Sequence, residues 1–143
     1  MGVSSPQNLG PSIPMSDLSR IIPESAPVTP DTDIFGPEPA HTWCYFFQKA
    51  DLARQMEDWD EVLDLYKQAQ RLGFNPEYGA EYIPFIEAFA QTGDWQNAYD
   101  LTIAAEELTP RHKRMLCGNW FRFAEFPSAD MKIKKKIIQD LPC

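Results

Sequence analysis

The chain of 143 residues is long enough for one domain, and its 43% hydrophobic and 13% aromatic content is enough for a sizeable core. The net charge of −8 and the isoelectric point near 4.7 exclude nucleic acid as the main partner, because phosphate binding needs a concentrated basic surface. The sequence has no run of about 18 apolar residues and therefore no membrane span.

The charges are spread unevenly along the chain. Residues 1–38 carry five acids and one base, residues 39–110 carry thirteen acids and four bases, and residues 111–143 carry three acids and eight bases. A folded chain with this distribution is strongly dipolar, which would orient its encounter with a charged partner at low salt.

Residues 1–38 form a proline-rich lead, since eight of the thirteen prolines lie in residues 1–39. This composition excludes a regular helix and predicts an extended segment that is flexible or partly docked on the rest of the chain. Two short apolar pieces could dock, SDLSRII (16–22) and DIFG (33–36), although a tethered linker is the preferred interpretation.

Residues 39–143 show the apolar period of helices. Trp43, Phe46, Phe47, Ala50 and Ala53 follow the spacing i, i+3, i+4, i+7, i+10. Similar patterns begin at Val62, Tyr82, Ala98, Cys117 and Ile133, and the fifth includes Trp120, Phe121 and Ala124. The sequence therefore predicts six amphipathic helices, with the third expected to start late or bend because Pro84 lies inside its pattern.

Two of these segments repeat each other. EDWDEVLDLYKQA (57–69) aligns with GDWQNAYDLTIAA (93–105) at an offset of 36 residues. A period of this size, with two helices in each unit, indicates helical hairpins that stack on one another. Asp58 and Asp94 are expected to cap the second helix of each unit, with Glu61 completing a capping box in the first.

The repeated unit resembles the tetratricopeptide repeat. The second unit carries the family's pattern at Gly93, Asp94, Trp95, Ala98, Ala105 and Pro110, with Tyr82, Phe85 and Phe89 in its first helix and Ile86 in place of the preferred Gly. The first unit keeps Ala50, Ala53, Trp59, Tyr66 and Ala69, but has Glu57 for the turn Gly and Val62 for the Ala. The resemblance implies an all-α solenoid of stacked antiparallel hairpins, with about 2.5 to 3 repeats and a last hairpin that caps the stack.

A narrower resemblance covers residues 16–125. The runs that carry it are FGPEPAHTWCYFFQKADLARQMEDWDEV, EYIPFIEAFAQTGDWQNA and LCGNWF. They look like the soluble C-terminal region of bacterial multi-pass membrane proteins of the glycosyltransferase-like type. This resemblance implies that the chain is part of a larger membrane protein, and it implies no catalytic residue, because the sugar-transfer chemistry of such proteins belongs to their membrane part.

The candidate chemical groups favour structural roles. His41 and Cys44 would need His112 and Cys117 to hold a zinc ion, and stacked hairpins keep the two pairs apart, so we expect no metal, no cofactor and no Cys44–Cys117 disulfide. The carboxylates Asp58, Asp60, Glu61 and Asp64 are expected to stabilise a helix start rather than to act as acid and base. With no catalytic motif in the sequence, we expect no enzymatic activity.

The cysteines and lysines bear on localisation. The odd count of three cysteines favours reduced thiols. The chain as given is therefore expected to be soluble and by default cytoplasmic. If it belongs to a membrane protein, it is expected to be membrane-associated. In the last helix, Ile133, Ile137, Ile138 and Leu141 are expected opposite Lys132, Lys134, Lys135 and Lys136. These lysines could bind anionic lipid headgroups, but a solvated face is the preferred interpretation.

The predicted function is binding of a protein or peptide. In the tetratricopeptide family the first helices line a concave groove, and this resemblance places ten residues in it: Phe47, Asp51, Arg54, Gln55, Ile83, Glu87, Gln91, Asn119, Arg122 and Phe123. The chain would then be a non-catalytic interaction or scaffold module, its mixed charges selecting the partner. Two alternatives stay open: a short stack that acts only as a spacer or dimerising piece, and an accessory domain of a membrane-bound glycosyltransferase that uses a lipid-linked donor.

Overall fold

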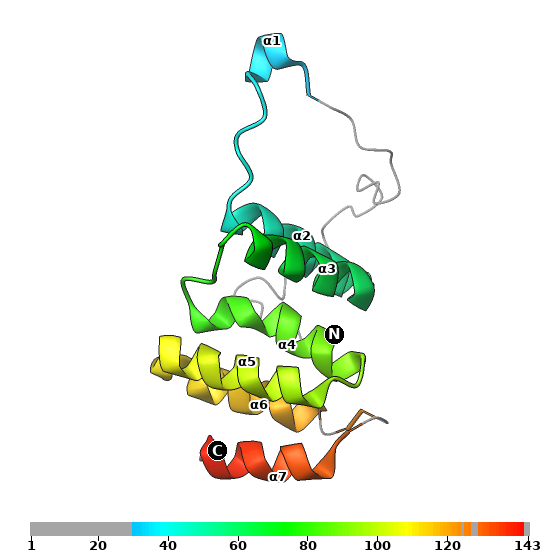
Figure 1. Cartoon of the computed structure of the whole chain (residues 1–143), viewed down its shortest axis with the longest axis vertical. Helices are drawn as coiled ribbons and strands as arrows, with labels where there is room; N and C mark the ends of the chain where they lie inside the picture. Colours follow the sequence, from blue (N-terminus) through cyan, green and yellow to red (C-terminus); the bar gives the residue numbers. More distant parts are fainter. Residues whose placement is uncertain (1–29, 124, 127–128, 142–143) are drawn as a thin grey trace, which may run out of the picture. The chain divides into compact units, whose positions relative to one another are not determined.

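The computed structural model describes residues 30–123, 125–126 and 129–141. Every regular element in this part is a helix and no strand occurs in it, so the prediction of an all-α fold is confirmed there (Figure 1). The chain divides into two units, the first ending at Glu38 and the second beginning at Pro39, and each is described by itself. The expected docking of residues 16–22 lies outside the described residues.

The described part of the first unit, from residue 30 on, contains one short helix that the proline content did not predict. This helix, α1 (Thr32–Phe35), is a single turn. The Asp31 side chain accepts a hydrogen bond from the Asp33 backbone N–H at 2.8 Å, and the Gly36 N–H donates to the Thr32 carbonyl at 2.9 Å. Gly36 can end the turn because its φ of 76° is open to glycine.

The second unit contains the six predicted helices. They are α2 (Trp43–Gln55), α3 (Trp59–Arg71), α4 (Ile83–Gln91), α5 (Trp95–Leu108), α6 (Lys113–Phe123) and α7 (Met131–Asp140), with short 3-10 helices η3 (Gly79–Tyr82) and η4 (Pro110–His112) before α4 and α6. The late start expected for the third helix is confirmed, because Pro84 lies in the first turn of α4, where its missing N–H breaks no helical bond. No helix among the described residues is long and apolar enough to cross a lipid bilayer.

The links α2–α3 and α4–α5 have the same backbone geometry. Each contains one residue with positive φ, Glu57 at 60° and Gly93 at 84°, followed by an aspartate whose side chain accepts a backbone N–H three residues on. The predicted caps Asp58 and Asp94 are thus confirmed. The capping box is not, because the Asp58 N–H donates to the Ala53 carbonyl at 2.9 Å and closes the end of α2 instead of reaching the Glu61 carboxylate.

α4 lies at the centre of the helical packing (Figure 1). It contacts α2 and α3 on one side and α5 and α6 on the other, while α7 contacts α5. Phe85 belongs to a buried cluster shared by α2, α3 and α4, and Trp120 and Phe123 belong to a second cluster shared by α4, α5, α6 and α7. Trp120 Nε1 donates to Thr102 Oγ1 at 2.9 Å, which fixes α6 on α5.

Three of four individual side chains differ from expectation, namely Phe121, Ile138 and Cys117. Phe121 and Ile138 were expected on packing faces but are exposed, because each lies at the edge of its helix's apolar arc, beyond the neighbour that covers the rest. Cys44 lies on the outward side of α2 and keeps a free thiol. Cys117 is buried and disulfide-bonded, since an odd count of cysteines still permits one bridge. Ala124 lies outside the described residues.

Candidate partner-binding face

The candidate face is formed by the side chains that α2, α4 and α6 present next to one another. α4 contacts both of the other helices, so a residue at its centre can reach the two neighbours. The residues involved recur every three or four positions, as in Asp51 and Arg54 of α2 and in Asn119 and Arg122 of α6, which keeps them on one side of each helix.

Glu87 joins the three helices. Its Oε2 lies 3.1 Å from Arg54 Nη1 of α2, and its Oε1 lies 3.0 Å from Arg122 Nη2 of α6. The Glu87 side chain is 8% exposed, whereas the side chains of Arg54 and Arg122 are 27% and 38% exposed. One buried carboxylate therefore positions two partly exposed guanidinium groups.

Further polar groups extend this network on both sides. Arg54 contacts Asp51 Oδ1 through Nη2 at 2.8 Å and through Nε at 2.9 Å, and Gln55 Nε2 donates to Asp51 Oδ2 at 3.1 Å. On α6, Arg122 Nη2 donates to Asn119 Oδ1 at 3.2 Å. Six of the ten predicted site residues thus form one hydrogen-bonded network across three helices, which we call the Glu87 network.

The Glu87 network contains two guanidinium groups and two carboxylates. The pKa of Arg54 is raised above its ordinary value: burial alone would lower it, and the hydrogen bonds and charges of Asp51 and Glu87 more than offset the burial. The buried Arg122 Nε has no hydrogen-bond partner among the described residues, and the exposed part of this side chain is what a ligand could reach. Because a guanidinium group carries five N–H donors, the exposed N–H groups of both arginines can donate further hydrogen bonds to a ligand.

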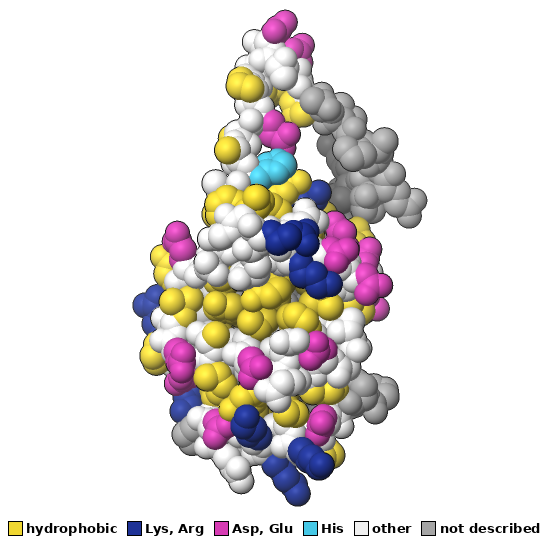
Figure 2. Space-filling view, viewed as in Figure 1, with side chains coloured by type: hydrophobic (Ala, Val, Ile, Leu, Met, Phe, Trp, Pro, Cys, Tyr) yellow, Lys and Arg dark blue, Asp and Glu magenta, His cyan; other side chains and the backbone are white. Residues whose placement is uncertain are grey.

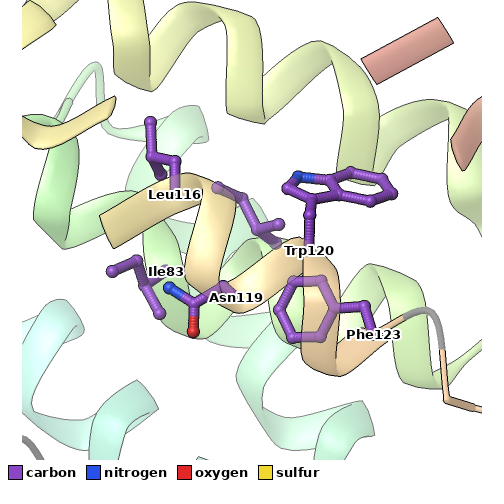
Figure 3. A pocket seen from close by; sticks show the side chains of 6 residues that line it. Ile83, Leu116, Asn119, Trp120 and Phe123 are labelled. Carbon is purple, nitrogen blue, oxygen red and sulfur yellow. The ribbon is translucent and has the colours of Figure 1, made fainter. Parts of the chain in front are cut away.

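An apolar crevice lies beside the Glu87 network, between α4 and α6. It is lined by Ile83, Ile86, Leu116, Asn119, Trp120 and Phe123, which pack so closely that no water-sized space is left between them (Figure 3). Figure 3 shows Asn119 beside Ile83, with Trp120 directed away from them. The crevice is a shallow apolar depression and not a cavity for a small molecule, so a partner's apolar side chain would lie against it rather than enter it.

The remaining predicted site residues differ in what they can offer to a partner. Phe47 is half-buried and stacks on Trp43, and Gln91 is exposed at the end of α4. Phe123 is fully buried, and its ring packs against Trp120 and Phe126 while it also lines the crevice. The guanidinium carbon (Cζ) of Arg122, the preceding residue, lies 5.4 Å from the centre of the Phe123 ring.

Met115 extends this face by one turn and was not among the predicted site residues. This residue precedes Asn119 by four positions, which puts it on the same side of α6, and it is 38% exposed. Asn119 Nδ2 donates to its backbone carbonyl at 3.2 Å. Extending the strip of Asn119 and Arg122 by one turn toward the start of α6 would have identified it.

The other chemically suggestive residues lie apart. Asp58 caps α3 and Asp64 pairs with Lys67 at 3.4 Å, so these carboxylates act as a helix cap and a surface ion pair. The His41 ring stacks on Tyr45 at 3.5 Å. Within the described ranges no three His, Cys, Asp or Glu residues come together as a metal site, and the expectation that the chain binds no metal stays a prediction.

Comparison with protein-family models, with curated proteins and with solved structures finds no match to this chain in any of the three.

Proposed function

We propose that residues 39–143 form a tetratricopeptide-like repeat module that binds a peptide segment of a partner protein across α2, α4 and α6. The Glu87 network carries this proposal, because the buried Glu87 of α4 holds two partly exposed arginines, one on α2 and one on α6, and an apolar crevice lies next to them. A segment with carboxylates for Arg54 and Arg122 and one apolar side chain for the crevice would match this arrangement.

The packing of the helices supports the repeat assignment. Helices α2 and α3 form one antiparallel pair and α4 and α5 a second, with the same link geometry in each, and the first helices of the two pairs touch. α6 and α7 take the place of a closing pair. Because successive pairs bury each other's apolar sides, the module would present a fixed surface to a partner.

A peptide library tests the proposal. The full chain is immobilised, random peptides displayed on phage are selected on it, and the affinity of enriched peptides is measured by fluorescence polarisation. We expect acidic peptides with one large apolar residue, and a drop in affinity of about tenfold or more for Arg122→Gln, because a hydrogen-bonded charge is lost. Arg71→Gln, at an exposed arginine of α3, should bind as the wild type does.

Two results would contradict the proposed function. One is a selection that enriches no peptide above an unrelated protein of equal charge. The other is a set of binders that lose the same affinity in Arg122→Gln and in Arg71→Gln, because the effect would then follow net charge and not this face.

We also propose, from the second resemblance, that the chain is the C-terminal part of a larger bacterial membrane protein of the glycosyltransferase-like type. That resemblance implies that sugar transfer belongs to the membrane part of such a protein and not to these residues. Sequencing the DNA upstream of the first codon tests this: an open frame with several apolar segments of about 20 residues supports it, and a stop codon directly upstream opposes it.

A further inference from the structure

The outward side of α7 carries apolar and basic side chains together. Met131 is 57% exposed and Ile138 is 46% exposed, although Ile137 and Leu141 of the same segment are buried. Met131 and Ile138 lie seven residues apart, which puts them two turns apart on one side of the helix with Lys134 and Lys135 between them. Figure 2 shows Lys and Arg side chains (dark blue) over the end of the molecule where Figure 1 places α7.

Contacts with α5 hold α7 in this orientation. Tyr99 Oη donates to Asp140 Oδ2 at 2.5 Å, and Lys136 Nζ lies 3.9 Å from the centre of the Tyr99 ring. Because Asp140 is the only acid of α7 and is engaged with Tyr99, no acidic side chain of the helix is left to offset its lysines.

The lysines of the outward side have no ion-pair partner. Lys132, Lys134 and Lys135 make no ion pair within the part of the chain that the structure describes. By contrast, Lys67 pairs with Asp64 on α3, and Lys49 lies over the Tyr45 ring on α2. The positive charge of α7 is therefore available to an external anion.

We propose that the outward side of α7 binds the surface of an anionic lipid bilayer. Each lysine near such a surface contributes about 1 kcal/mol of attraction, which corresponds to about fivefold in the partition coefficient. Met131 and Ile138 point the same way and can enter the headgroup region together, while the lysine stems lie along them with their ammonium groups at the phosphates.

A bilayer fits this side of α7 better than an acidic peptide does. The strip is the convex side of a single helix, and a planar surface can meet it along its whole length without a pocket. The apolar crevice against which a peptide side chain could lie is between α4 and α6 instead. Membrane binding therefore uses a different surface from the proposed peptide-binding face, and the two proposals can fail separately.

Vesicle co-sedimentation of the full chain tests membrane binding at low salt. We expect binding to vesicles of phosphatidylglycerol and phosphatidylcholine in equal parts, and none to phosphatidylcholine alone. Lys134→Gln/Lys135→Gln should lower the partition coefficient by about thirtyfold. Met131→Ser/Ile138→Ser should lower it by about tenfold, because two apolar side chains no longer enter the headgroup region.

The matched control is Lys49→Gln/Lys67→Gln, which removes the same charge from α2 and α3 and should bind as the wild type does. Circular dichroism confirms that each variant is folded. The proposal is overturned if the full chain does not bind the anionic vesicles, if it binds uncharged vesicles equally well, or if the control pair weakens binding as much as the α7 pair.

Discussion

The pair α2–α3 and the pair α4–α5 share one local design but differ in their surroundings. Their links have matching backbone geometry, with Glu57 and Gly93 at positive φ and Asp58 and Asp94 as caps. α4 is buried on nearly all sides, whereas α2 leaves Leu52 and other apolar residues exposed. The same local sequence pattern thus produces the same turn in both pairs. The position of each helix in the packing determines how much of its surface is buried by neighbouring helices.

The largest loss of stability is expected from a substitution in η3, just before the pair α4–α5 begins. A Cβ on Gly79 would lie 2.2 Å from the carbonyl oxygen of Ala105, a backbone atom that cannot move aside. Gly79→Ala should lower the free energy of unfolding by about 3 kcal/mol, measured by urea denaturation, because η3 must move away from α5. Gly118→Ala is the control, since a Cβ there meets nothing within 4 Å, and it should be neutral or slightly stabilising.

Glu87 of α4 and Asp51 of α2 occupy equivalent positions in the two pairs, and neutralising each compares the stability contribution of a buried carboxylate with that of a half-exposed one. Glu87 and Asp51 are separated by the repeat offset of 36 residues, and their side chains are 8% and 34% exposed. Glu87→Gln should cost about 2 kcal/mol of stability, because two arginines lose a buried partner. Asp51→Asn should cost less than about 1 kcal/mol. Equal costs in chemical denaturation would show that Glu87 does not join the three helices.

The two caps should behave alike. Asp58 accepts the Glu61 N–H at 3.1 Å and Asp94 accepts the Asn97 N–H at 3.2 Å. Asp58→Ala and Asp94→Ala should each lower the unfolding free energy by about 1 kcal/mol, because each leaves a helix-start N–H without its acceptor. A cost confined to one pair, seen in thermal unfolding of the two variants, would mean that the links are not equivalent.

The smallest expected change in stability comes from the positive-φ residues of the two links, and its sign is opposite in the two pairs. Glu57 holds a φ of 60°, a conformation that costs a residue with a side chain about 1 kcal/mol relative to glycine. Glu57→Gly should therefore stabilise the chain by up to about 1 kcal/mol, and Gly93→Ala should destabilise it by a similar amount. A rise in melting temperature for Gly93→Ala would contradict this assignment of the turns.

The sequence alone was sufficient for features that depend on local order. The apolar period predicted α2 to α7, Pro84 indicated a late start for α4, and the aspartates before Trp59 and Trp95 predicted caps. These features follow from residues within one or two turns of each other, so no knowledge of the packing was needed.

Features that depend on distant residues could not be predicted in the same way. The resemblance placed Arg54, Glu87 and Arg122 on one face, but their ion pairs join residues more than thirty positions apart and required the packing of three helices. Phe123 and Ile138 lie near the edges of apolar arcs, where burial depends on how far a neighbouring helix extends. The sequence therefore placed Ile138 on the wrong side, and it did not indicate that Phe123 would be fully buried.

A double-mutant cycle tests the central claim, that Arg122 on the face of α2, α4 and α6 contacts a bound peptide. The tightest peptide from the selection is measured by calorimetry against the wild type and Arg122→Gln, with each acidic residue of the peptide intact or replaced by its amide. We predict a coupling free energy of at least about 1 kcal/mol between Arg122 and one peptide carboxylate. A coupling near zero for every acidic residue of the peptide would contradict the account.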